Sequence, residues 1–459
     1  MAGAKVDLTQ GSIPKHVLRM LGPFAIAIVA LMSAGLVDTW YLGNLTDEAR
    51  PDLGVWALAA VGIAFPLTFL GNSANIGLGA GTMSAISRAI GQDEMGRARR
   101  HAASAIVFAL LVMTGLVTIM YLGMPFMLEF YNDNDPAVIV MARDYLVISF
   151  PGLVIVSIAM MCNNVLRAGG EAALPSAIMI LGAIINIILD PFLIYGIGPF
   201  PRMEVQGAAL ATVLGNSIAA IFGLYLTVIL RKAIDFKEFS LRSFRNAVKV
   251  IGAVGVPAMG TNIIVPIATA IGVAIISQNL TTVDVAAFTL TMRLEIISVG
   301  LLYALSACIG AITGQNGGAG LTDRVRSTFK ACYWISFIWG TMIALVLTLI
   351  GPWLVGQFNS DPELIAKATP YFYIVPITVF AYGFVFVSAA GLNALGRPKF
   401  GLIYTIIRSL ILYIALVYIG VKLDGIRGAF IGIAAANLIS GFIAMGWTLK
   451  KAPMIAVKS

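Results

Sequence analysis

Four polar side chains lie inside otherwise apolar stretches of the N-terminal half: Asp38, Asn186, Asp190 and Thr212. Asn186 and Asp190 are four residues apart, so on a helix they share one face and lie one turn from each other. Pro191 follows directly and removes a backbone hydrogen-bond donor. Two carboxylates, an amide and a hydroxyl, with no cation nearby in sequence, are suited to sharing a proton or binding a sodium ion.

The composition places these groups in a membrane. Of the 459 residues, 59% are hydrophobic and 11% are charged, and the mean hydropathy is +0.92. Soluble proteins carry about 25% charged residues, so this chain has too few to cover a surface that faces water. The composition therefore indicates an integral membrane protein, and it disfavours soluble enzymes, nucleic-acid-binding proteins and disulfide-rich secreted domains.

Twelve stretches are apolar enough to cross a bilayer as helices, which takes about 20 residues each. An even number of spans puts both termini on one side. With that side taken as the cytoplasm, 22 of the 30 lysines and arginines fall in cytoplasmic loops and 6 in the opposite loops. The positive-inside rule therefore predicts cytoplasmic termini, in a plasma or inner membrane. The predicted spans are 17–42, 57–82, 102–124, 142–165, 174–197, 207–230, 250–278, 285–312, 331–354, 369–391, 401–420 and 428–449.

Short motifs of the first half recur in the same order in the second half. Examples are Tyr41–Thr46 with Ile276–Thr281, and Gly207–Asn216 with Gly428–Asn437. The repeat predicts an all-α fold of two six-helix lobes, related by a pseudo-twofold axis along the membrane normal, with the substrate between them. We expect an N-terminal lobe at 1–232, a cytoplasmic connector at 233–249 and a C-terminal lobe at 250–459.

The repeat also separates a functional cluster from a structural one. In the second half, the positions equivalent to Asn186, Asp190 and Thr212 carry apolar residues: Leu412, Leu416 and Ile433. The fold itself therefore does not require the polar residues. This asymmetry favours a functional role for the N-terminal cluster over a structural one.

The C-terminal half has its own charges within predicted spans: Arg293, Glu295 and Arg408. A charge at the bilayer centre costs at least about 2.5–3.5 kcal/mol, so each of these is a functional candidate. Glu295 is about three turns from the outer end of its span, and Arg408 about two turns from the inner end of its own. We expect a polar network here with an ion pair between Glu295 and Arg408; the alternative is that Glu295 faces a substrate cavity.

Asp38, Asn186-x-x-x-Asp190-Pro191 and Gly207-Ala-Ala-Leu-Ala-Thr212, within a six-plus-six repeat, resemble the multidrug and toxic compound extrusion (MATE) family. The resemblance covers essentially the whole chain. Arg293-Leu-Glu295 and the segment 314–320 look like its DinF-like branch. The NorM-like branch has a glutamate eight residues after the proline of its Gly-x-Pro motif, and Val265 stands at that position here. A NorM-type cation site in the C-terminal lobe is therefore not expected.

The resemblance implies a secondary active antiporter that exports amphipathic organic cations by alternating access, without a cofactor and as a monomer. Its coupling site would be Asp38, Asn186, Asp190 and Thr212, and the coupling ion H⁺ or possibly Na⁺. Two alternatives stay open: a sodium-coupled antiporter, and a lipid-linked oligosaccharide flippase of related fold. No catalytic constellation, metal-ligand spacing or phosphate-binding loop occurs in the sequence, so we expect neither an enzyme nor an ATP-driven pump.

Overall fold

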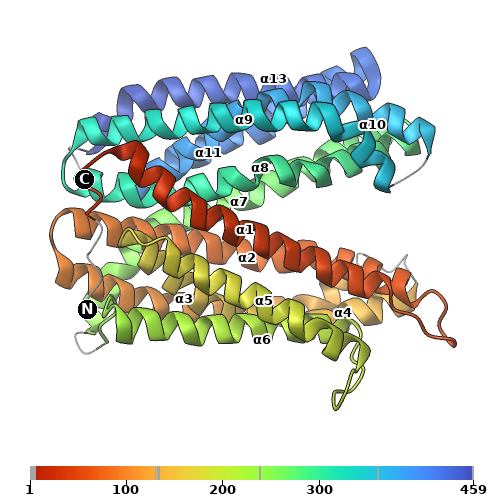
Figure 1. Cartoon of the computed structure of the whole chain (residues 1–459), viewed down its shortest axis with the longest axis horizontal. Coiled ribbons are helices and arrows are strands. Elements are labelled where there is room, and N and C mark those ends of the chain that lie inside the picture. The colour runs from red at the N-terminus through yellow and green to blue at the C-terminus, as the bar shows by residue number, and fades with distance from the viewer. Residues whose placement is uncertain (1–6, 130, 132–134, 237–238, 359–360, 457–459) are drawn as a thin grey trace. The chain divides into compact units, whose positions relative to one another are not determined.

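The computed structural model describes residues 7–129, 131, 135–236, 239–358 and 361–456. Throughout these residues the regular structure is helical and no strand occurs, which confirms the predicted all-helical fold (Figure 1). The helices are α1 (Ile13–Gly43), α2 (Leu53–Gly91), α3 (Met95–Glu129), α4 (Pro136–Ala168), α5 (Ala173–Tyr195), α6 (Val205–Leu224), η1 (Tyr225–Leu230), α7 (Leu241–Asn279), α8 (Thr282–Gly318), α9 (Thr322–Phe358), α10 (Pro362–Ile374), η2 (Pro376–Thr378), α11 (Val379–Ala394), α12 (Pro398–Ile406), η3 (Ile407–Tyr413) and α13 (Ile414–Ala456).

The last apolar stretch crosses a membrane twice. In the described part of the chain, 11 helical stretches are long and apolar enough to span, and Pro398–Met454 accounts for 57 residues in one of them. The backbone leaves the helical region at Asp424 (φ −147°, ψ 35°) and Gly425 (φ 54°, ψ −137°). On either side of this break, Gly420 lies against Gly428 and Leu416 against Gly432, which is the pairing of two antiparallel helices. Counting this hairpin as two spans gives the predicted twelve.

The second half of the predicted connector is helical. The stretch 233–249 was expected to link the lobes, yet α7 already begins at Leu241. The chain forms two compact units, and the boundary between them falls within α7, after Met259. The functional division into lobes at 233–249 stays a prediction.

The two units also divide the first two helices. The N-terminal unit includes Gly22–Ile86 and Glu94–Met259, whereas the C-terminal unit includes Asp7–Leu21, Ser87–Asp93 and the chain from Gly260 onward. The first turns of α1 and the last turns of α2 therefore belong to the C-terminal unit.

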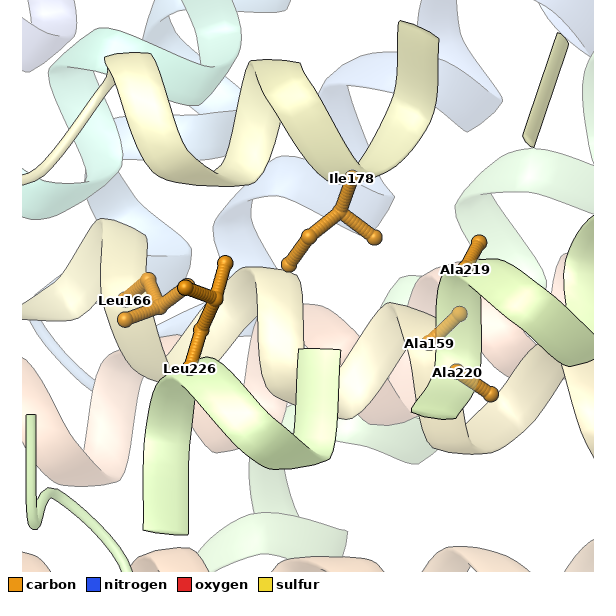
Figure 2. Packing of buried hydrophobic residues seen from close by; sticks show 6 residues of the cluster. All are labelled: Ala159, Leu166, Ile178, Ala219, Ala220 and Leu226. Atoms are coloured by element: carbon orange, nitrogen blue, oxygen red, sulfur yellow. The ribbon is translucent and has the colours of Figure 1, made fainter. Parts of the chain in front are cut away.

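Small residues bring α4, α5 and α6 close together in the N-terminal unit. Gly215 of α6 lies against the backbone of Gly182 on α5, and Gly223 against Cys162 on α4. Such small residues permit close backbone approach between membrane helices. Figure 2 shows the buried apolar cluster that fills this contact: Ala159, Leu166, Ile178, Ala219, Ala220 and Leu226.

An arginine clamp holds the start of the chain on the C-terminal unit. The Arg324 guanidinium donates to the backbone oxygens of Leu8 (3.0 Å), Gln10 (3.2 Å) and Gly11 (2.8 Å). It also donates to Oδ1 of Asn316 at 2.7 Å, and the Asn316 amide donates to the Leu8 oxygen at 3.0 Å. Leu8 and Asn316 are completely buried. The segment before α1 is thereby fixed to α8 and α9.

Candidate functional site

The predicted N-terminal cluster forms on the antiparallel helices α5 and α6. The side-chain amide of Asn186 donates to Oδ1 of Asp190 at 3.3 Å, as expected for residues one turn apart. It also donates to the Thr212 hydroxyl at 3.3 Å across the helix pair. Thr212 comes this close because Gly215, one turn further along α6, lies against the backbone of α5. The structure thus brings these three predicted residues together.

Asp38 on α1 completes the cluster. Its side chain interacts directly with the side chains of Asp190 and Asn186. Asp190 is completely buried and Asn186 is 6% exposed. Among the described residues, neither Oδ1 of Asp38 nor Oδ2 of Asp190 has a hydrogen-bond partner, although both atoms are buried.

Two adjacent carboxylates with unpartnered buried oxygens need a counter-charge. A buried polar atom without a partner is costly, and a buried unpaired charge costs far more. Two negative charges side by side add repulsion to this cost. A proton on one carboxyl group, or a small cation between them, would remove both penalties. The residues present therefore fit a monovalent cation.

The cluster opens onto a cavity of about 510 Å³ within the N-terminal unit. Asp38, Asn186 and Thr212 lie in its wall, and Asp190 lies behind them, away from the cavity. Most of the remaining wall is apolar, and its polar part consists mainly of uncharged side chains. Five asparagine amides line it: Asn72, Asn163, Asn164, Asn186 and Asn216.

Tyr145 and Arg167 are functional candidates that sequence reasoning missed. Both lie on α4 and line the cavity, and Tyr145 is close to Asp38. In the described lining Tyr145 is the sole aromatic ring and Arg167 the sole cation. Tyr145 gives no signal in the sequence, because one tyrosine in an apolar helix is ordinary. The pair Asn163-Asn164, in contrast, is unusual in a span and could have indicated that α4 faces a polar cavity.

The C-terminal charges are arranged differently from the prediction. Arg408 lies in the π-helical segment η3 and is 6% exposed. Its guanidinium lies 3.4 Å from the ring centroid of Tyr382 and donates to Oδ1 of Asn437 at 3.0 Å. In the described part of the chain no direct salt bridge joins it to Glu295, although the two charges interact electrostatically, and an aromatic face and a neutral amide contact the cation. A functional ion pair between Glu295 and Arg408 stays a prediction. Arg293 is exposed and takes no part in these contacts.

The MatE family model matches residues 23–192 and 257–419, which is most of the chain. The chain belongs to the MATE family. It is accordingly a transport protein with many membrane-spanning helices, and not an enzyme, as predicted.

Individual MATE relatives match nearly end to end. A protein of Shewanella oneidensis named "FAD transporter" is 30% identical over 436 residues, covering 95% of this chain and 94% of the relative. A "Probable multidrug resistance protein NorM" of Thermotoga maritima is 24% identical, covering 92% and 89%. The solved outward-facing structure of a multidrug resistance MATE family transporter is 24% identical, covers both chains completely and superposes with a TM-score of 0.90, which establishes the shared fold.

Proposed function

We propose that this chain is a proton-coupled antiporter that exports amphipathic organic cations across the plasma or inner membrane. Asp38, Asn186, Asp190 and Thr212 would form its coupling site, and both termini would be cytoplasmic. The observation that carries the proposal is the pair of buried carboxylate oxygens without partners, beside a cavity of about 510 Å³.

The amide of Asn186 favours a proton over sodium. Its nitrogen, not its oxygen, faces both Asp190 and Thr212. An N–H group donates hydrogen bonds and cannot ligate a cation. A sodium ion held by all four side chains would require this amide to turn over, whereas a proton shared by the two carboxyl groups leaves its hydrogen bonds intact.

The proposed cycle follows from this electrostatics. Proton binding from outside removes the repulsion between Asp38 and Asp190, and Asp38 then shifts within the cluster. Because Asp38 is on α1, this movement shifts part of the cavity wall and displaces the bound compound outward. Proton release to the cytoplasm restores the charged pair and the affinity for the next substrate.

Purified protein in liposomes tests the proposal. A pH gradient without sodium is expected to drive efflux of ethidium in the wild type, and Asp38→Asn or Asp190→Asn is expected to abolish it. Asp52→Asn, at an exposed position outside the cavity, is the matched control and should transport normally. Efflux that needs a sodium gradient at equal pH would reject proton coupling, and efflux by both cluster variants would reject the site.

A second candidate substrate is FAD, which a relative's name suggests and the cavity chemistry favours. An organic cation is commonly held by aromatic faces, yet the described wall has Tyr145 as its one ring. Five amides and Arg167 instead suit a ligand with many hydrogen-bonding groups and phosphates. If FAD is exported, Arg167→Gln should reduce FAD efflux and leave ethidium efflux unchanged; equal loss of both would count against it.

A further inference from the structure

The C-terminal unit carries an apolar groove of about 340 Å³ between α9, α11 and α13, far from the cluster in sequence. Six aromatic rings line it: Tyr333, Trp334, Phe337, Phe380, Phe384 and Phe442. Trp334, Phe337 and Phe442 are 66%, 42% and 51% exposed. The groove is therefore an open furrow on the surface of the helices and not an enclosed core.

The rings support one another and keep the groove open. Phe380 contacts Phe337 with ring centroids 5.2 Å apart, Phe384 at 5.6 Å and Phe442 at 6.3 Å, all edge to face. The Tyr333 hydroxyl is hydrogen-bonded to the Ser388 hydroxyl at 2.7 Å, so it presents no free polar group to the groove. The wall is consequently apolar and preorganised for an apolar chain.

One charged side chain, Lys330, lies at an end of this groove. It precedes Trp334 by one turn on the same face of α9 and is exposed. The groove continues from Lys330 to Phe337, about 10 Å along the helix axis. Leu449 of α13 also lines the groove and is followed by two exposed cations, Lys450 and Lys451. The positive charge is thus concentrated where α9 begins and α13 ends.

We propose that this groove binds an anionic phospholipid of the surrounding membrane, with one acyl chain against the rings and the phosphate on Lys330. A ligand that matches the groove needs one negative end and a long apolar part, and an anionic phospholipid has both. A lysine near the membrane surface contributes about fivefold to the binding of an anionic lipid. A zwitterionic lipid of equal chain length would place its acyl chain against the rings equally well. Its headgroup, which has no net charge, would gain less binding free energy from Lys330.

Native mass spectrometry of the whole protein, titrated with phosphatidylglycerol or phosphatidylcholine of identical acyl chains, tests this. The wild type is expected to prefer phosphatidylglycerol about fivefold. Lys330→Gln should remove the preference while both lipids still bind, and Phe442→Ala should weaken both lipids together. The matched controls are Lys249→Gln, an exposed lysine of α7, and Phe65→Ala, a 63% exposed ring of α2.

Each other outcome overturns the proposal. It fails if the wild type does not distinguish the two lipids, if Lys330→Gln keeps the preference, or if Lys249→Gln removes it equally. Glycerol 3-phosphate is expected not to compete; competition by it would mean that a free phosphate, not a lipid, is the ligand. Displacement of phosphatidylglycerol from the wild type by ethidium, but not from Phe442→Ala, would identify the groove as a substrate site instead.

Discussion

Asn186 and Asp190 face each other across one turn of α5, joined by a hydrogen bond of 3.3 Å that also orients the Asn186 amide toward α6. Among the described hydrogen bonds, this amide is the one side-chain donor to the completely buried carboxyl group of Asp190. The pair therefore links the charge of the cluster to the contact between α5 and α6.

Replacing Asn186 with alanine tests that link. Asn186→Ala leaves the Asp190 oxygen without a donor, which costs about 1–3 kcal/mol. We expect a lower melting temperature and strongly reduced proton-driven efflux, measured by fluorescence unfolding and in liposomes. Asn246→Ala, at an exposed position of α7, is the control and should change neither. Wild-type efflux in Asn186→Ala would contradict a role for the amide in coupling.

Arg408→Lys should destabilise the C-terminal unit even though it keeps the charge. A lysine ammonium cannot both lie flat on the Tyr382 ring and donate to Asn437 as the planar guanidinium does. The loss of the stacking alone is expected to cost about 0.5–2 kcal/mol, read as a fall in melting temperature. Arg326→Lys, an exposed position of α9, is the matched control. Equal melting temperatures for the two variants would show that the contact with Tyr382 contributes nothing.

Arg324→Gln should release the segment before α1. The variant loses the hydrogen bonds to the oxygens of Leu8 and Gly11, while the Asn316 contact to Leu8 alone remains. Hydrogen exchange of residues 8–21 is expected to become faster by tenfold or more, because about 1.4 kcal/mol of protection corresponds to tenfold. Arg326→Gln is the control. Unchanged exchange in Arg324→Gln would mean that burial of Leu8, not the clamp, holds the segment.

The loop between α1 and α2 should make stability depend on pH. Hydrogen bonds from the Arg50 side chain and then from the Ala49 backbone lower the pKa of Asp47 below its ordinary value. A carboxyl group whose pKa is lower in the folded state stabilises the fold above its ordinary pKa, and this contribution is lost as the pH falls through the lowered pKa. The melting temperature of the wild type should therefore exceed that of Asp47→Asn at pH 6, and the difference should shrink as the pH falls below the ordinary pKa of the carboxyl group.

The control for that loop is Asp52→Asn, an exposed position close to Asp47. Its melting temperature is expected to follow that of the wild type at every pH. A difference for Asp47→Asn that stays constant from pH 6 to pH 3 would show that the aspartate acts through its shape and not through its charge.

The spans could be predicted from the sequence because membrane helices must be long and continuously apolar. Each predicted span lies on a helical stretch, including the two that Gly425 separates within α13. Asn186 and Asp190 were predictable as neighbours because their spacing is one helical turn. The position of Thr212 beside them was predictable because α5 and α6 are consecutive antiparallel helices.

The partners of Arg408 could not be predicted, because they depend on packing between distant segments. Tyr382 and Asn437 are 26 and 29 residues away and come from separate helices. Opposite charges in one unit suggested an ion pair, but a buried guanidinium is equally satisfied by a ring face and an amide oxygen. Tyr145 was missed for a related reason: its place beside Asp38 follows from how α4 is rotated, which the sequence does not express.

One helix, α1, contributes residues to both units. Leu21 and Asp38 are on opposite sides of the division, about 25 Å apart along one continuous helix. The Arg324 clamp holds the segment just before this helix, and Asp38 is near the other end of it, so both are joined by the backbone of α1 alone. Pro23, just beyond the division, has no backbone N–H to donate, so the hydrogen-bond ladder of α1 is interrupted where the helix passes from one unit to the other.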